Sequence, residues 1–298
     1  MSATRTIPGA QHASRASAYL ALTKPDVSFL VVLTTAAGFY LGARGPLDFL
    51  RMAQTVFGTT LVAAGTSALN HYIERATDAH MRRTASRPLP TGQLRPREAA
   101  IFGASLVLIG TVYLALVAGA LASFLGLFTS VTYLGLYTPL KMRTTLATAV
   151  GAIPGAVPPL IGWVAARGSL SREAWLLFAI MVLWQFPHFL AIAWMYREDY
   201  ARAGIRMLPV VDPQGARTFR QIIGCAIVLL PVSLFMTLWG AAGIRYFFGA
   251  IVLGLALIQL CLWAASQKTN VRAKWLMHAT VLHLPLLLAL MMIDKIQH

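Results

Sequence analysis

The feature that most constrains this chain is a series of apolar runs, each about 20 residues long, separated by short polar loops. An α-helix needs about 20 apolar residues to cross the core of a bilayer. Lipid offers no partners for backbone polar groups, so crossing segments of this kind are helical. The pattern predicts an all-α integral membrane protein with nine spans around a central cavity. They are placed near residues 27–45, 53–73, 99–117, 120–139, 146–166, 174–195, 221–241, 246–266 and 274–293.

The charged residues predict how the chain is oriented in the membrane. Of 298 residues, 57% are hydrophobic and 12% are charged, with 25 Lys and Arg against 10 Asp and Glu. In a soluble protein this balance would indicate nucleic-acid binding, but here the basic residues lie in short loops between spans, so no nucleic-acid partner is expected. Loops on the N-terminal side carry 19 Lys and Arg, and the opposite loops carry 6. The excess predicts a cytoplasmic N-terminus, an outer C-terminus and location in the cell membrane.

The same pattern gives a simple domain organisation. Residues 1–20 form a polar cytoplasmic arm without the apolar stretch of a secretory signal, and residues 21–298 form one membrane domain. Both cysteines, Cys225 and Cys261, lie inside apolar runs and are interpreted as packing residues.

One polar stretch directly follows the second apolar run and reads "NHYIERATDAHMRRTASRPLPTG", starting at Asn70. If the helix continues past Asn70, then Asn70, Glu74 and Asp78 project from one face, because residues four apart are neighbours on a helix. Oxygen ligands with room for water and phosphate suit Mg²⁺. Arg83 and Arg87 repeat the four-residue step and offer guanidinium forks for phosphate oxygens. A solvated helix end explains any one pair, but the complete set predicts a magnesium–diphosphate site.

The stretch resembles the first signature of the UbiA superfamily of intramembrane prenyltransferases, Asn-x3-Asp-x3-Asp followed by Arg-x3-Arg-Pro. This sequence departs from that pattern at Glu74, where Glu replaces Asp but can still coordinate a metal. The resemblance implies nine transmembrane helices around a central cavity and Mg²⁺-dependent binding of an isoprenyl diphosphate. Asn70, Glu74 and Asp78 would then be metal ligands with a catalytic role.

A second stretch, "WQFPHFLAIAWMYREDYARAGIRMLPVV" at 184–211, resembles one family within this superfamily, the protohaem IX farnesyltransferases. "LTKPDV" at 22–27 and "YTPLKMRTTLATAVGAIPGAVPPLIGW" at 137–163 resemble other landmarks of that family. The resemblance implies transfer of a farnesyl group from farnesyl diphosphate to a vinyl group of haem b, with addition of water, to give haem O. It also implies that haem A synthase or terminal-oxidase assembly proteins receive the product.

The second stretch also departs from the wider superfamily. The second Asp-x3-Asp pair of the superfamily falls on Tyr196 and Tyr200, so ligation of a second metal ion is not supported. An acceptor site different from that of quinone-precursor enzymes is therefore expected, with Tyr196 and Tyr200 among its residues. Arg197, Asp199 and Arg202 are further candidates for binding diphosphate or haem propionates.

Three further candidates lie elsewhere: His188 is assigned a catalytic role, and Lys141 and Arg143 are weaker candidates. His188 lies inside an apolar span directly after Pro187; a membrane histidine is often an interhelical hydrogen-bonding group, but imidazole suits haem iron or acid–base work. By resemblance it is assigned to the haem half of the reaction, about 15 Å deeper than the Glu198–Asp199 pair along a straight helix. Lys141 and Arg143 end the fourth span, where they bind diphosphate or only anchor the helix.

Two alternative functions fit parts of the pattern. A prenyltransferase acting on a quinone precursor would keep the first signature but would have Asp at positions 196 and 200. A transporter could use an inverted repeat and a broken helix, but has no need for arginines beside three oxygen ligands.

A helix break is predicted within "GAIPGAVPPLIGW", which has three prolines and three glycines.

Overall fold

The computed structural model describes residues 14–296, so residues 1–13 of the predicted arm lie outside the described part. Within that part the chain is helical, and its extended pairing is limited to one isolated bridge between Ala242 and Lys295. The helices are α1 (Arg15–Leu22), α2 (Pro25–Gly42), α3 (Phe49–Asp78), α4 (Pro96–Val117), α5 (Ala120–Thr132), η1 (Tyr133–Tyr137), α6 (Thr138–Leu140), α7 (Ala147–Gly155), α8 (Pro158–Arg167), α9 (Arg172–Met195), α10 (Arg197–Arg202), α11 (Leu208–Val211), α12 (Ala216–Leu238), α13 (Ile244–Gln267) and α14 (Asn270–Ile293).

The apolar runs of the sequence correspond to the long helices. Seven helical segments are long and apolar enough to cross a membrane, and Ser28–Gly42 of α2 is apolar but shorter. Helix α3, with 30 residues, is long but more polar. Each predicted span falls on helix in the structure, and the predicted all-α class is confirmed for residues 14–296. The number of membrane crossings and the orientation of the termini stay predictions.

Several predicted spans are interrupted rather than straight. Helix α7 ends at Gly155 and α8 begins at Pro158, which confirms the predicted break. Proline lacks the backbone N–H that would continue the helix, so the backbone hydrogen bonds between consecutive turns cannot all form here. From α9, Gln185 donates its side-chain amide to the Ala152 carbonyl at 3.0 Å and joins the broken segment to its neighbour. Between α5 and α6 the chain forms the π-helix η1, which the apolar pattern did not predict.

Close packing of α2 against α8 depends on glycine. A Cβ atom on Gly38 would collide with the backbone of Pro159, and one on Gly162 would collide with the Thr35 carbonyl oxygen. Small residues let two helix backbones approach in a membrane, where hydrophobic exclusion does not drive helices together. Trp163 of α8, one of the large fully buried residues, lies beside Gly42 of α2 at this contact.

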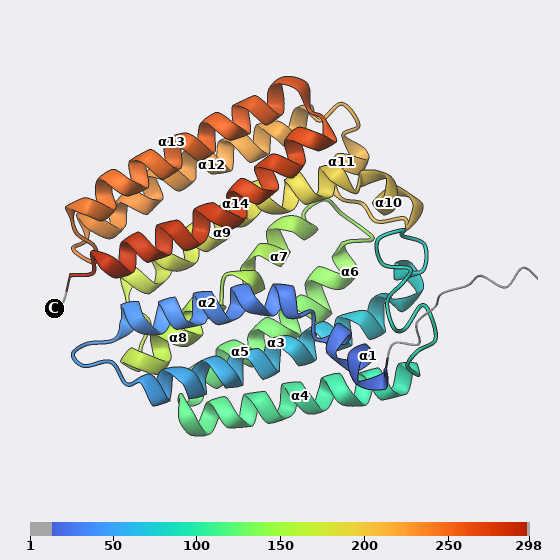
Figure 1. Cartoon of the computed structure of the whole chain (residues 1–298), viewed down its shortest axis with the longest axis horizontal. Helices are drawn as coiled ribbons and strands as arrows, with labels where there is room; N and C mark the ends of the chain where they lie inside the picture. Colours follow the sequence, from blue (N-terminus) through green and yellow to red (C-terminus); the bar gives the residue numbers. More distant parts are fainter. Residues whose placement is uncertain (1–13, 297–298) are drawn as a thin grey trace, which may run out of the picture.

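The two ends of the bundle differ. At one end lie α1, α10, α11 and the loop that follows α3, and at the other lies the C-terminal end of the described chain (Figure 1). Part of the predicted polar arm forms α1, which buries Ala18 and Leu22 in a cluster with Ala68 of α3. At the C-terminal end the Lys295 ammonium donates to the carbonyls of Tyr40 and Ala43 at 2.6 Å each, which satisfies the end of α2.

Candidate active site

Helix α3 continues without interruption to Asp78, as the motif requires. Asn70, Glu74 and Asp78 therefore lie one turn apart along one face of one helix. We call these three side chains the oxygen row. Asn70 and Asp78 are 1% and 0% exposed, so the row lies within the bundle rather than on a solvated helix end. A rigid helix fixes the spacing of the three ligand groups before any ligand arrives.

Each member of the oxygen row accepts a hydrogen bond from a cationic side chain. Lys24 Nζ lies 3.0 Å from Asn70 Oδ1, and Lys141 Nζ lies 2.7 Å from Glu74 Oε1. Arg87 Nη1 forms an ion pair with Asp78 Oδ2 at 2.7 Å. We call Lys24, Arg87 and Lys141 the cation trio. The structure thus joins the predicted oxygen ligands to two of the predicted diphosphate-binding cations, Arg87 and Lys141.

Lys24 is a functional candidate that sequence reasoning missed. Lys24 belongs to the family landmark at 22–27, but the sequence alone gives its side chain no role, because its partner Asn70 lies 46 residues away along the chain. The residue precedes Pro25 with φ 47° and ψ 69°, a left-handed conformation. Burial, followed by the nearby charge of Arg87, lowers the pKa of Lys24 to about 7. A partly buried, strained and electrostatically perturbed lysine is a typical feature of a functional site.

Lys141 is held in an aromatic setting. Its Nζ lies 4.3 Å from the centre of the Tyr137 ring and 5.9 Å from that of the Tyr133 ring, both within η1. Burial opposes the charge of Lys141, but Tyr137, Tyr133 and Glu74 together raise its pKa above the ordinary value. The ammonium therefore stays charged. Single-turn π-helices are frequent at functional sites, a signal that the sequence pattern did not reveal.

The donor set of the oxygen row fits Mg²⁺. Asp78 Oδ1 is buried and has no hydrogen-bond partner, so one carboxylate oxygen remains available for a metal ion. Among residues 14–296 there is no group of three or more His, Cys, Asp or Glu side chains that could hold a metal. Two carboxylates and an amide do not form an all-protein cage, but Mg²⁺ usually takes one or two carboxylates together with water and substrate phosphates.

The second polar stretch approaches the first. The Arg83 backbone N–H donates to Asp199 Oδ2 at 3.3 Å, and the Arg83 guanidinium lies 4.9 Å from the centre of the Tyr196 ring. Asp199 also forms an ion pair with Arg202, and Tyr200 is buried beside this group. The two polar stretches are therefore in contact in the folded chain. Asp199 is bonded to Arg83 of the loop after α3 and to Arg202 of its own helix α10, not to the oxygen row.

Two predicted residues lie apart from this group. Arg197 donates to the Trp194 carbonyl at 2.8 Å and to Asn270 Oδ1 at 2.6 Å, so its guanidinium is committed to the junction of α9 and α14. Arg143 is exposed on the loop after α6. The sequence left Arg197 open between diphosphate and haem propionates, and Arg143 between diphosphate binding and helix anchoring, because it does not show which way loop side chains turn.

His188 lies on α9 against α14. Its Nδ1 is 2.8 Å from Thr280 Oγ1, and its ring stacks on Trp184 with centroids 5.1 Å apart. The Thr280 hydroxyl donates its single hydrogen to the Met277 carbonyl at 2.6 Å. His188 Nδ1 must therefore donate to Thr280, and Nε2 keeps its lone pair. Helix α9 ends at Met195, so seven residues, or a rise of about 10 Å at 1.5 Å per residue, separate His188 from that end of the helix.

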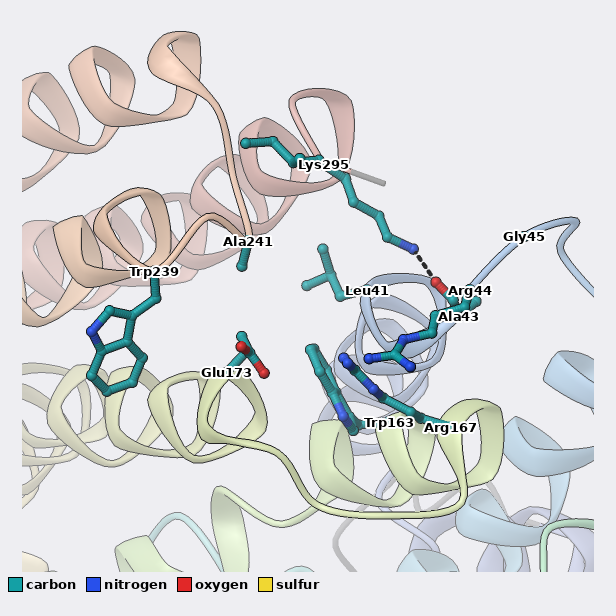
Figure 2. Close-up of a pocket in the computed structure, with 11 residues that line it drawn as sticks. Leu41, Ala43, Arg44, Gly45, Trp163, Arg167, Glu173, Trp239, Ala241 and Lys295 are labelled. Atoms are coloured by element: carbon teal, nitrogen blue, oxygen red, sulfur yellow. Dashed lines mark hydrogen bonds between the residues drawn. The ribbon is translucent and has the colours of Figure 1, made fainter. Parts of the chain in front are cut away.

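A pocket of about 70 Å³ lies at the opposite end of the bundle from this cluster, among Arg44, Arg167 and Lys295 (Figure 2). Its lining includes Trp163 and Trp239, and none of the predicted site residues. Because Lys295 is bonded to the end of α2, as Figure 2 shows for the Ala43 carbonyl, we interpret this cavity as part of the closure of that end.

The family model for the UbiA prenyltransferase family matches residues 31–284, which is most of the chain. The chain belongs to the UbiA prenyltransferase family. The resemblance that the two sequence motifs suggested is thereby confirmed.

Relatives within the UbiA family agree on a narrower group. The chain is 48% identical over 286 residues to "Protoheme IX farnesyltransferase" of Solibacter usitatus (strain Ellin6076), covering 93% of this chain and 98% of that protein. It is 44% identical over 276 residues to the protein of the same name from Salinibacter ruber (strain DSM 13855 / M31), with coverage of 93% and 98%.

Solved structures share the UbiA fold at low sequence identity. A structure of digeranylgeranylglyceryl phosphate synthase matches with a TM-score of 0.78 and 16% identity, covering 94% of this chain and 98% of that one. A UbiA homologue from Archaeoglobus fulgidus bound to DMAPP and Mg²⁺ matches with a TM-score of 0.62 and 14% identity, with coverage of 92% and 98%. At these identities the likeness concerns the fold of an integral membrane protein.

Proposed function

We propose that this chain transfers the farnesyl group of farnesyl diphosphate to a vinyl group of haem b, with addition of water, to give haem O. The observation that carries the proposal is the buried oxygen row of α3 with its bound cations. Its chemistry suits a metal–diphosphate group, and it lies in a chain whose relatives at 48% identity are named protohaem IX farnesyltransferases.

The oxygen row would hold Mg²⁺, which when bound offsets the negative charge of the departing diphosphate. Arg87 and Lys141 lie at hydrogen-bonding distance from the same row and would bind diphosphate oxygens directly. Fixed cations of this kind stabilise the charge that develops on the leaving group as the allylic C–O bond ionises. The rings of Tyr133 and Tyr137 line the approach to Lys141, and aromatic faces also favour a nearby carbocation.

The haem half of the reaction is assigned to the surroundings of His188. The vinyl π-bond attacks the farnesyl cation, a C–C bond forms, and a water oxygen adds to the carbon left positive beside the porphyrin ring. That water must lose a proton. His188 Nε2 keeps a lone pair because Nδ1 donates to Thr280, so Nε2 is able to accept this proton or to ligate iron. Arg202, Tyr196 and Tyr200 remain candidates for the haem propionates.

The proposal includes a membrane arrangement. Nine spans follow from the apolar runs of the sequence. A cytoplasmic N-terminus, an outer C-terminus and an active site facing the cytoplasm follow from the excess of Lys and Arg in the loops on the N-terminal side. Both polar loops that approach each other belong to that side. A charged diphosphate would therefore enter from water at the cytoplasmic rim rather than cross the apolar core.

Product identity tests the proposed function. Membranes containing the protein are incubated with haem b, farnesyl diphosphate and Mg²⁺, and extracted haem is analysed by mass spectrometry. We expect a haem with one added farnesyl group and one added water. Farnesylation of a quinone precursor in the same membranes, with haem unchanged, would contradict the proposal.

A further inference from the structure

The oxygen row and the cation trio are paired one to one, although the three cations come from distant parts of the chain. One precedes α2, one lies in the loop after α3, and one follows α6. The pairs are largely buried: the side chains of Arg87 and Lys141 are 20% and 12% exposed. Solvent screening is weak at such a site, so the charge of each new ligand matters.

Lys24 is the unusual member of the trio. Its partner is the neutral Asn70 oxygen, whereas Arg87 and Lys141 each pair with a carboxylate. Its backbone is left-handed with φ 47°, a conformation that residues with a Cβ atom seldom adopt. A strained backbone at the mouth of a polar site points to a function for the side chain that it presents.

Charge balance links the two ligands. When Lys24 is protonated, the trio and the two carboxylates of the row leave one positive charge in excess, so a metal ion alone increases the excess and competes with the trio for the same oxygens. A diphosphate has several negative charges and accepts hydrogen bonds from ammonium and guanidinium groups. Once the trio turns to the diphosphate, the oxygen row is free for the metal.

We propose that divalent metal and diphosphate bind cooperatively at this site by exchange of partners, and that Lys24 leaves Asn70 to bind the diphosphate. This inference rests on the proposed function, because it assumes that the oxygen row binds a metal and that the trio binds diphosphate. It adds Lys24 to the diphosphate-binding residues and explains why its side chain is held against a neutral oxygen. Coupling by exchange is reciprocal, so metal tightens diphosphate binding by the same factor.

Binding of Mn²⁺ to the purified full-length protein tests the proposal, because carboxylate and carbonyl oxygens suit Mn²⁺ as they suit Mg²⁺. Free Mn²⁺ is measured from its EPR signal with and without saturating farnesyl thiolodiphosphate, which resists ionisation. Parallel titrations without protein correct for Mn²⁺ bound to the analogue in solution. In the wild-type protein we expect the analogue to lower the Kd for Mn²⁺ by about 10-fold or more, within the range typical of coupled sites.

The decisive comparison is Lys24→Met. Without the Lys24 ammonium, we expect Mn²⁺ alone to bind more tightly and the analogue to bind more weakly. The coupling factor, which is the ratio of the Kd for Mn²⁺ without the analogue to the Kd with it, should fall several-fold. Lys274→Met, on the exposed side of α14, is the matched control and should keep the wild-type factor. If Lys24→Met does not fold, Lys24→Gly accepts the left-handed backbone without strain and gives the same test.

Two results would overturn the inference in different ways. If wild-type protein binds both Mn²⁺ and the analogue, but the coupling factor equals that of Lys24→Met, partner exchange is wrong while the proposed function stands. If the analogue does not bind wild-type protein at all, the proposed function is lost together with the inference.

Discussion

At the scale of single residues, Asp78 combines two properties that rarely occur together. One of its carboxylate oxygens is paired with Arg87, and the other is buried without a partner. An unpaired buried carboxylate oxygen is unfavourable, so its retention here is most simply explained by a ligand that completes the site.

Replacement of this carboxylate tests the metal assignment. Asp78→Asn keeps the size of the side chain but removes its charge, so we expect normal membrane insertion and a loss of kcat by about 10²-fold or more. Glu198→Gln, on an exposed position of α10, is the matched control and should retain most of the activity. Normal turnover by Asp78→Asn at several Mg²⁺ concentrations would contradict a metal role for the oxygen row.

Arg87 tests the need for a guanidinium. Lys supplies the same charge but cannot present a planar fork to two oxygens, so Arg87→Lys should raise the KM for farnesyl diphosphate by about 10-fold. Arg75→Lys is the control, because Arg75 is exposed near the end of α3 and donates to the Tyr72 carbonyl. Equal KM values for Arg87→Lys and wild type would reduce Arg87 to a structural partner of Asp78.

Thr280 positions His188 without touching a substrate. Thr280→Val removes the acceptor for Nδ1–H and frees the imidazole to change tautomer, so we expect haem transfer to fall by about 10-fold or more, as for other residues that orient a ligand. Farnesyl diphosphate affinity should be unchanged, while the absorption spectrum of bound haem shifts if Nε2 ligates iron. Thr280→Ser should restore both properties. An unaltered rate in Thr280→Val would show that the hydrogen bond is only structural.

At the scale of elements, the helix interruptions and the close helix contacts are what shape the bundle. Prolines and glycines in the sequence predicted the break between α7 and α8. Proline lacks a backbone N–H and interrupts a helix where it stands, so this effect can be recognised from the local sequence. They did not predict η1, α10 or α11, whose conformations depend on contacts with distant segments. Between α10 and α11, the Arg206 backbone N–H donates to the Lys141 carbonyl, just after α6, at 2.8 Å.

Packing of α2 on α8 gives a stability prediction. Gly162→Ala places a methyl group against the Thr35 carbonyl, and a backbone cannot move aside as a side chain can, so we expect destabilisation by about 1–3 kcal/mol. Gly224→Ala, in helix α12 with open space at its Cβ position, should be neutral or stabilising by up to about 1 kcal/mol. Thermal unfolding of both variants in the same detergent measures the difference. Equal unfolding temperatures for Gly162→Ala and Gly224→Ala would contradict the close contact between α2 and α8.

At the scale of the whole molecule, the sequence predicted the class of fold and the family but only part of the site. Apolar runs and the four-residue step on α3 are local patterns, so they could be recognised without coordinates. The pairing of Lys24 with Asn70, and of Lys141 with Glu74 across 67 residues, depends on how the helices assemble. For the same reason, the sequence left Arg197 as a candidate for diphosphate or haem propionates, and only the folded chain shows its guanidinium bonded to Asn270.

The central claim is that one molecule joins diphosphate departure to haem modification through a metal held by α3. The most direct measurement is a reaction of purified protein in liposomes with haem b and farnesyl diphosphate, in which released diphosphate and farnesylated haem are both quantified. With Mg²⁺ present we expect equal amounts of the two products, and with a chelator neither. Release of diphosphate without farnesylated haem, or full product formation in the presence of the chelator, would contradict the account.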